Sequence, residues 1–168
     1  EAIDRGAKGV SVQVNMGSPT EADMIERLGI ISSDTNYLDI PLLGMIYPRG
    51  ENLLIMDGDV TDGAAHAARL AFELGCQVVK TKWTGSIESF RKVTNSVPIP
   101  VLIAGGPAGS STEDILQIVY DSMQAGGGGV CMGRQVFSHE NPEAMVSALK
   151  MIVHNGSEVS EAMKKCGL

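Results

Sequence analysis

Short apolar runs alternate with longer amphipathic stretches along the whole chain, and this alternation restricts the fold most strongly. The runs are continuous and rich in Val, Ile and Leu, which is typical of strands buried on both faces of a parallel sheet. They are Val10–Asn15, Pro41–Tyr47, Cys76–Lys82, Pro100–Ala104 and Gly129–Met132. The pattern predicts the α/β class: five βα units with right-handed crossovers.

Helices are predicted between and after these strands. Thr112 opens the sequence TEDI, where an N-cap residue precedes acidic residues, and Gly75 and Gly126 are expected to end helices. The opening segment EAIDRGAKGVSVQVN is predicted to be a helix that runs into the first strand. The remaining predicted helices are Thr20–Tyr37, Thr61–Leu74, Ser86–Thr94, Thr112–Ala125, Pro142–His154 and a short one after Ser157.

Two architectures fit this order: an open doubly wound sheet, or part of a (β/α)₈ TIM barrel. The last two strands end in Gly105-Gly106 and Gly133-Arg134, and TIM barrels often bind phosphate in the loops after strands seven and eight. Counting back from there places Lys80 on strand six and Tyr47 on strand five. A whole barrel needs about 250 residues. We therefore expect one domain, residues 1–168, that holds strands four to eight of an N-terminally truncated TIM barrel.

Composition narrows the possible functions. The net charge is −7 and the pI about 4.9, and no basic tract is present, which argues against nucleic-acid binding. No apolar run reaches transmembrane length, so no membrane partner is expected. Cys76, Cys131 and Cys166 are far apart and form no CxxC, which favours the reducing cytoplasm.

No metal site is expected from the sequence. The three histidines show no ligand spacing. The stretch DGDVTDG, Asp57–Gly63, resembles a calcium loop, but Asp62 replaces the glycine at its sixth position and Ala68 the glutamate at its twelfth. A solvated loop is the better interpretation of this stretch.

Lys80 and Tyr47 are the candidate catalytic residues. Strand alternation puts Lys80 on the same face as Val78 and Lys82. A lysine that points into a barrel loses water, and Lys82 is a second cation nearby, so both effects would lower the pKa of Lys80. A neutral amine can form a Schiff base, and a phenol at position 47 could act as its acid or base. The alternatives are a lysine that snorkels or pairs with a carboxylate, and a tyrosine that packs at the rim.

Two arginines are candidates for binding an anion. Arg134 follows Gly133, where a guanidinium and exposed backbone donors together suit a phosphate. An ion pair with a helix acid is the alternative for Arg134. Arg49 could reach a substrate phosphate or a solvated loop carboxylate.

Four motifs, IYPRG, VVKTKWTG, IAGGPAG and MGRQVF, occur in an order and spacing that resemble the archaeal-type class I fructose-bisphosphate aldolase family. The resemblance covers essentially the whole chain. Within the family, VQVNMGS and MIYPRG resemble the 2-amino-3,7-dideoxy-D-threo-hept-6-ulosonate synthase branch, which is transaldolase-like and serves an alternative route to aromatic amino acids. The family often has Lys after GGP, where this chain has Ala108, so one phosphate contact would be lost.

The resemblance implies a (β/α)₈ aldolase or transaldolase that acts on ketose phosphates without a cofactor. It implies a homo-oligomer, with a phosphorylated sugar as the ligand. Lys80 would form the Schiff base, Tyr47 would be the acid/base, and Arg49 and Lys82 are further possible substrate contacts. The phosphate would be bound by Ala104, Gly105, Gly106, Gly133 and Arg134. The alternatives are a phosphate- or flavin-binding TIM barrel without lysine chemistry, and an inactive piece of an aldolase.

Overall fold

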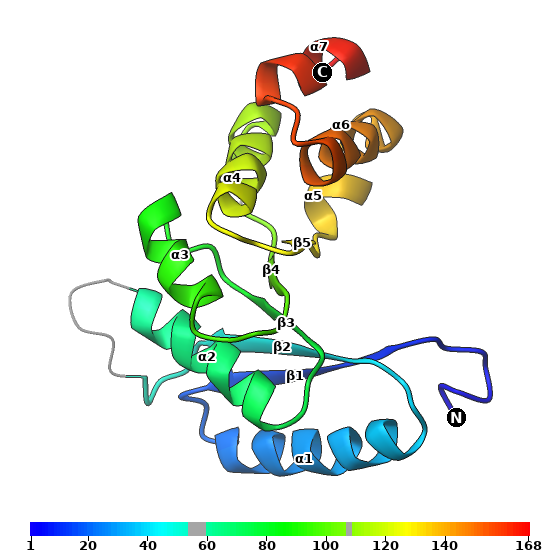
Figure 1. The fold of residues 1–168 in the computed structure, drawn as a ribbon, viewed down its shortest axis with the longest axis vertical. Coiled ribbons are helices and arrows are strands. Elements are labelled where there is room, and N and C mark those ends of the chain that lie inside the picture. The colour runs from blue at the N-terminus through cyan, green and yellow to red at the C-terminus, as the bar shows by residue number, and fades with distance from the viewer. Residues whose placement is uncertain (54–59, 107–108) are drawn as a thin grey trace.

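A curled parallel sheet with helices on its outer side organises the molecule (Figure 1). The computed structural model describes residues 1–53, 60–106 and 109–168. The strands follow one another in sequence order, and every neighbouring pair is parallel. They are β1 (Val10–Met16), β2 (Leu42–Pro48), β3 (Val78–Thr81), β4 (Val101–Ile103) and β5 (Gly129–Val130). The predicted α/β class and the five strands are confirmed.

The helices alternate with the strands as the crossovers require. They are α1 (Glu21–Tyr37), α2 (Thr61–Glu73), α3 (Ile87–Thr94), α4 (Thr112–Gln124), α5 (Arg134–Phe137), α6 (Pro142–Asn155) and α7 (Val159–Cys166). The four-residue α5 was not predicted. Within the described residues, no helix is both long and apolar enough to cross a bilayer.

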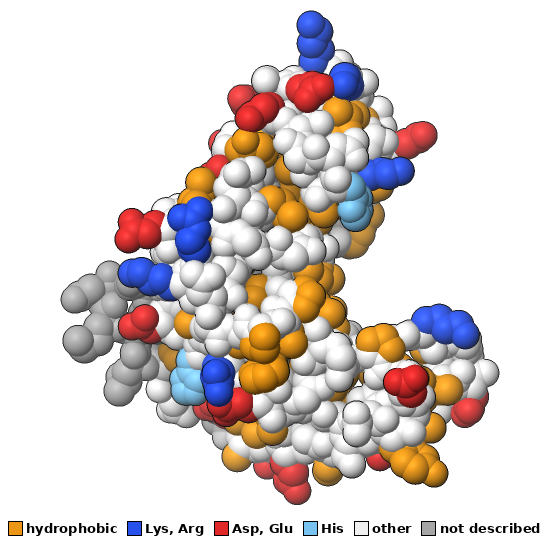
Figure 2. Space-filling model, in the orientation of Figure 1, with side chains coloured by type: hydrophobic (Ala, Val, Ile, Leu, Met, Phe, Trp, Pro, Cys, Tyr) orange, Lys and Arg blue, Asp and Glu red, His pale blue; other side chains and the backbone are white. Residues whose placement is uncertain are grey.

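The two faces of the sheet differ in burial. Alternate strand residues such as Val14, Ile46 and Val79 are fully buried on the outer face. Their neighbours on the inner face, such as Met45 and Leu102, are only partly buried. Figure 2 shows a hollow between the part formed by α4–α7 and the part formed by β1 and α1. Burial on both faces was therefore wrong for the described part of the chain, where the inner face lines an open hollow.

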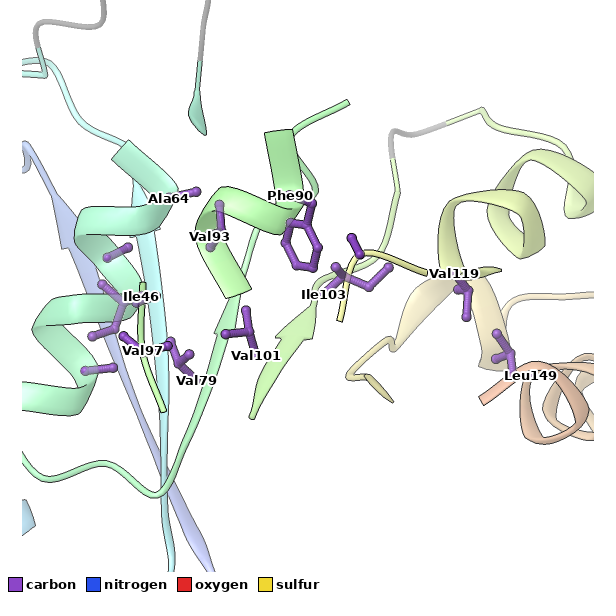
Figure 3. Packing of buried hydrophobic residues seen from close by; sticks show 14 of the residues in the cluster. Ile46, Ala64, Val79, Phe90, Val93, Val97, Val101, Ile103, Val119 and Leu149 are labelled. Atoms are coloured by element: carbon purple, nitrogen blue, oxygen red, sulfur yellow. The ribbon is translucent and has the colours of Figure 1, made fainter. Parts of the chain in front are cut away.

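The core lies between the outer face of the sheet and the helices (Figure 3). Ala64, Ala67, Ala68 and Ala71 place small side chains along one side of α2. Opposite them, a Cβ at Gly44 would lie 2.9 Å from the Cys76 Sγ atom and 3.2 Å from the Ala71 Cβ atom. Small residues on both sides let α2 pack closely on β2, the strand that carries Tyr47.

Four local predictions need correction or fall outside the described residues. Residues 1–9 form turns and not a helix, with Gly6 at a φ of 86°, a backbone region that does not continue an α-helix. The N-cap of α4 is Ser111 and not Thr112, because the Ser111 hydroxyl accepts a hydrogen bond from the Asp114 N–H. The expectation for Ala108, and that for Asp57–Gly63 as far as residue 59, concern residues outside the described ranges.

Candidate active site

A pocket of about 460 Å³ opens at the carboxyl ends of the strands. Its predicted residues come from the ends of strands, from the loops that follow and, for Arg134, from the first residue of α5, because parallel strands all end at one edge of a sheet. The pocket brings together all nine residues predicted from the sequence: Tyr47, Arg49, Lys80, Lys82, Ala104, Gly105, Gly106, Gly133 and Arg134. These residues are up to 87 positions apart in the sequence, from 47 to 134, so the fold makes this a single site.

Lys80 reaches the pocket because of the alternation of β3. Its neighbours Val79 and Thr81 are fully buried on the outer face, so Lys80 must point to the inner face. In the sheet register it lies between Met45 of β2 and Leu102 of β4. The stem of the lysine therefore has apolar neighbours while its amine faces the pocket.

Trp83 fixes the end of β3 from the other side. Its ring lies 5.2 Å from the ring of Phe90 in α3, at an interplanar angle of 49°. A tilted aromatic pair at this distance is a favourable arrangement. The prediction that Trp83 faces the surrounding helices is confirmed, and this packing anchors the strand end that carries Lys80 and Lys82.

The pocket is cationic although the chain is acidic. Arg49, Lys80, Lys82 and Arg134 line it, and no Asp or Glu does so among the described residues. None of the four forms an ion pair with a described carboxylate, so the alternative of a helix-acid pair for Arg134 has no support here. Four unpaired positive charges around one cavity create a positive potential that suits an anionic ligand.

Backbone donors add to this potential. Within the described ranges, the N–H groups of Gly105, Gly106 and Gly133 have no hydrogen-bond acceptor. The Ala104 N–H differs, because it donates to the Thr81 carbonyl at 2.8 Å. Ala104 therefore forms part of the wall, and the three glycines remain as candidate donors to a phosphate.

Arg49 is held at the pocket by contacts between the loops after β1 and β2. The Arg49 N–H donates to the Met16 carbonyl at 2.9 Å, and the Asn52 N–H donates to the Gly17 carbonyl at 2.9 Å. A Cβ at Gly50 would overlap the backbone carbonyl of Gly17. The close approach of these two loops thus requires glycine at position 50.

Gly50→Ala should therefore displace the loop that carries Arg49. We expect phosphate binding to weaken by roughly tenfold, about 1.4 kcal/mol, with a loss of stability of about 1–3 kcal/mol. Phosphate titration and urea denaturation measure the two effects. Gly29→Ala is the control, since a Cβ there meets no atom within 4 Å; equal behaviour of the two variants would contradict the role of this contact.

Four lining residues were not predicted: Gln13, Cys131, Gln135 and Phe137. Gln13 is on the inner face of β1 and donates from Nε2 to the Asn15 Oδ1 atom at 3.1 Å. The two-residue alternation of β1 could have identified it. Gln135 gave no sequence signal, because its partner is the Gly106 carbonyl, 29 positions away, which accepts from Nε2 at 2.8 Å.

Metal ligands do not gather in the described structure. No group of three or more His, Cys, Asp or Glu residues there could hold a metal ion. His139 is engaged locally, with Nε2 at 2.9 Å from the Thr112 Oγ1 atom and Nδ1 accepting from the Asn141 N–H at 3.0 Å.

The three cysteines should differ in reactivity. Cys76 is only 3% exposed, and burial raises the pKa of its thiol to about 11, so thiolate is scarce at neutral pH. Cys131 and Cys166 are partly exposed. With iodoacetamide at pH 8 we expect peptide mass mapping to find Cys131 and Cys166 modified and Cys76 unmodified, until urea exposes it. Phosphate should slow the modification of Cys131 alone; equal protection of Cys166 would contradict the pocket position.

Raised pKa at Cys76 also sets a pH dependence of stability. Burial raises the pKa of the Cys76 thiol above its usual value of 9.0, so below pH 9 the buried thiol makes its full contribution to the free energy of unfolding. This contribution is lost as the pH rises toward 11, because the thiol then loses its proton.

Comparisons with known proteins identify the family of the chain. The model of the DeoC/LacD family aldolases matches residues 1–139. The chain belongs to the DeoC/LacD aldolase family. A curated family relative, the 2-amino-3,7-dideoxy-D-threo-hept-6-ulosonate synthase of Halobacterium salinarum, is 41% identical over 100% of this chain and 62% of its own length. The 2-amino-4,5-dihydroxy-6-oxo-7-(phosphonooxy)heptanoate synthase of Streptomyces griseus is 37% identical over 99% of this chain and 60% of its own length.

Solved structures of the DeoC/LacD aldolase type show the same fold. An archaeal fructose-1,6-bisphosphate aldolase, with its catalytic Lys covalently bound to the carbinolamine intermediate of the substrate, matches with a TM-score of 0.83 and 33% identity. The match covers 90% of this chain and 60% of that one. The chain thus spans about 60% of the length of these relatives. The resemblance drawn from the four motifs and the assignment to a TIM-barrel fold are confirmed.

Proposed function

We propose that this chain carries the lysine and the phosphate site of a class I aldolase or transaldolase that acts on ketose phosphates. The observation that supports it most is the convergence of Lys80 and Tyr47 on a pocket lined by three further basic residues and no described carboxylate. An amine and a phenol beside an anion site are the groups that Schiff-base chemistry on a phosphorylated ketone requires.

The proposed reaction starts at the Lys80 amine. Its lone pair attacks the ketone carbon to give a carbinolamine, which loses water to form an iminium. The positive iminium accepts the electron pair of the adjacent Cα–Cβ bond as that bond breaks, so the aldehyde leaves and an enamine remains on Lys80. Protonation of the enamine carbon and hydrolysis of the resulting iminium release the ketone product and free the lysine. In the synthetic direction the same enamine carbon attacks an acceptor aldehyde. This chemistry uses the covalent imine in place of a cofactor.

Tyr47 is proposed to move the proton in these steps. It occupies the penultimate position of β2 and lines the same pocket as Lys80. A phenol there can donate a proton to the departing carbinolamine hydroxyl and take one from the substrate hydroxyl during cleavage. Without this transfer, the carbinolamine oxygen would have to leave as hydroxide.

The substrate phosphate is proposed to lie against Gly105, Gly106 and Gly133, with Arg134 beside it. The three N–H groups lack acceptors in the described structure, and a guanidinium can bind a phosphate through two hydrogen bonds. Arg49 and Lys82 extend the positive lining toward the rest of the substrate. Ala104 contributes wall area only.

The synthase branch is the proposed subgroup. The two synthase relatives are 41% and 37% identical to this chain, compared with 33% for the solved fructose-bisphosphate aldolase. A cytoplasmic location and a homo-oligomeric ring are proposed as well. Three dispersed free cysteines support the location, and the family resemblance supports the ring.

Borohydride trapping tests the proposed function. The chain is incubated with dihydroxyacetone phosphate, reduced, digested and mapped by mass spectrometry. A reduced adduct on Lys80 is the expected result. If no lysine is modified and the purified protein shows flavin absorbance, the alternative of a flavin-binding barrel replaces the aldolase. If only a version with the three further βα units of its relatives reacts, this chain alone is an inactive part of the enzyme.

A further inference from the structure

We infer that Gln135 is a positioning residue that holds the two glycine loops of the phosphate pocket in register. Gln135 is the second residue of α5, directly after Gly133 and Arg134. Its carboxamide extends back to the loop after β4 and donates to the Gly106 carbonyl at 2.8 Å. One side chain therefore joins the loop after β4 to the loop after β5. The inference rests on the proposed phosphate pocket.

The backbone alone does not connect these loops. In the part of the chain that the structure describes, the ladder between β4 and β5 ends with the Cys131 N–H, which donates to the Ile103 carbonyl at 3.0 Å. The candidate donors at Gly105, Gly106 and Gly133 all lie beyond that bond. Glycines lose more conformational freedom than other residues when they are ordered. A brace between the loops removes part of that freedom before the ligand arrives, which strengthens binding.

Gly105 and Gln135 depend on each other. The atoms nearest to a Cβ placed at Gly105 are those of the Gln135 carboxamide, closer than any real contact allows. The Gln135 side chain therefore lies over Gly105 and can make its bond to Gly106 only because residue 105 has no side chain. An alanine at 105 would push the carboxamide away and break the brace.

Gln135 also forms a wall. The active-site pocket adjoins a second cavity of about 420 Å³, and Gly106, Arg134 and Gln135 line both. Loss of the Gln135 side chain would connect the two spaces on the phosphate side. Substitution can separate the effect of the hydrogen bond from the effect of the wall. Methionine at position 135 retains the length of the side chain and lacks the donor, whereas alanine removes both.

Binding of inorganic phosphate, followed by calorimetry, tests the inference. Gln135→Met should raise the Kd about 3- to 10-fold, the factor expected for one lost hydrogen bond, and Gln135→Ala should raise it further. In borohydride trapping, the concentration of dihydroxyacetone phosphate that gives half of the maximal adduct should rise by the same factor, and the maximal amount of adduct should stay the same. Unliganded thermal unfolding verifies that each variant is folded.

A double-mutant cycle with Gly105→Ala gives a second readout that a merely structural role would not produce. Gly105→Ala should weaken phosphate binding by about as much as Gln135→Met in the unsubstituted chain, because each breaks the same bond. Added to Gln135→Ala, it should have little further effect, since the space over residue 105 is then empty.

The outcomes separate this inference from the proposed function. A Gln135→Met variant that binds phosphate as tightly as the unsubstituted chain, or additive effects in the cycle, would overturn the brace and leave the Lys80 adduct unaffected. Unsubstituted protein that binds no phosphate would overturn it as well. If the variants change the Kd for phosphate as expected and no adduct forms on Lys80, the Schiff-base function is refuted and the brace remains supported.

Discussion

Lys80→Met is expected to reduce the borohydride-trapped adduct to background, because Lys80 is the amine proposed to form the imine. The variant should stay folded. Methionine has nearly the length of lysine, and its neighbours Met45 and Leu102 are apolar, so the substitution exchanges a partly buried amine for a side chain that packs there. Mass spectrometry after reduction measures the adduct, and urea denaturation measures the stability.

Lys82→Met is the matched control. The substitution removes the same charge from a residue that lies two positions further along the chain and lines the same pocket. Strand alternation places both lysines on the same face of the chain. We expect this variant to retain the adduct on Lys80, with phosphate binding weakened by a few-fold because one positive charge is gone. An adduct that survives Lys80→Met, or that disappears in Lys82→Met and not in Lys80→Met, would refute the assignment.

Phe90→Ala should cost about 3–5 kcal/mol of the free energy of unfolding, the usual range for removing a buried aromatic ring. Phe90 is fully buried, and Figure 3 shows it between Val93 of its own helix and Ile103 of β4. Its ring also supports Trp83 at 5.2 Å. The free energy of unfolding of a typical domain is about 5–15 kcal/mol, so this single substitution would bring the chain near unfolding.

Urea denaturation measures this effect, and the fluorescence of Trp83, the one tryptophan of the sequence, follows it. Phe90→Leu is the control, for which we expect a loss of about 1–1.5 kcal/mol because most of the volume is retained. A loss below about 1 kcal/mol for Phe90→Ala would show that the ring is not part of the core that holds the end of β3.

Sequence patterns predicted the fold well where burial dictates the residue type. The runs that became β2 and β3 stood out because their outer-face residues are buried against helices, and in β1 the same holds for Val14 and Met16. The strand predicted over Gly129–Met132 is present as the two-residue β5, whereas the four-residue α5 is too short to show a period and was not predicted. The supposed first helix failed for a similar reason, since residues 1–9 are mostly exposed turns and their composition alone does not determine a helix.

The charged residues that line the pocket could be predicted from the sequence, and Gln135 could not. A lysine inside an apolar strand is costly without a role, so Lys80 drew attention, and glycine pairs at strand ends indicated the anion loops. Gln135 carries no such cost, because a glutamine after a loop is ordinary surface composition. Its importance comes from a contact to Gly106 across the sheet edge, which only the three-dimensional arrangement reveals.

The four cations of the pocket also repel one another. With no described carboxylate among them, like charges gathered in one cavity raise the free energy of the folded chain until an anion enters. Folding and anion binding are therefore thermodynamically linked, and an ion that occupies the folded state stabilises it in proportion to the logarithm of its concentration. If phosphate binds this pocket as proposed, phosphate in a storage buffer would protect the fold and compete with the proposed phosphorylated substrate, while chloride would do less of either.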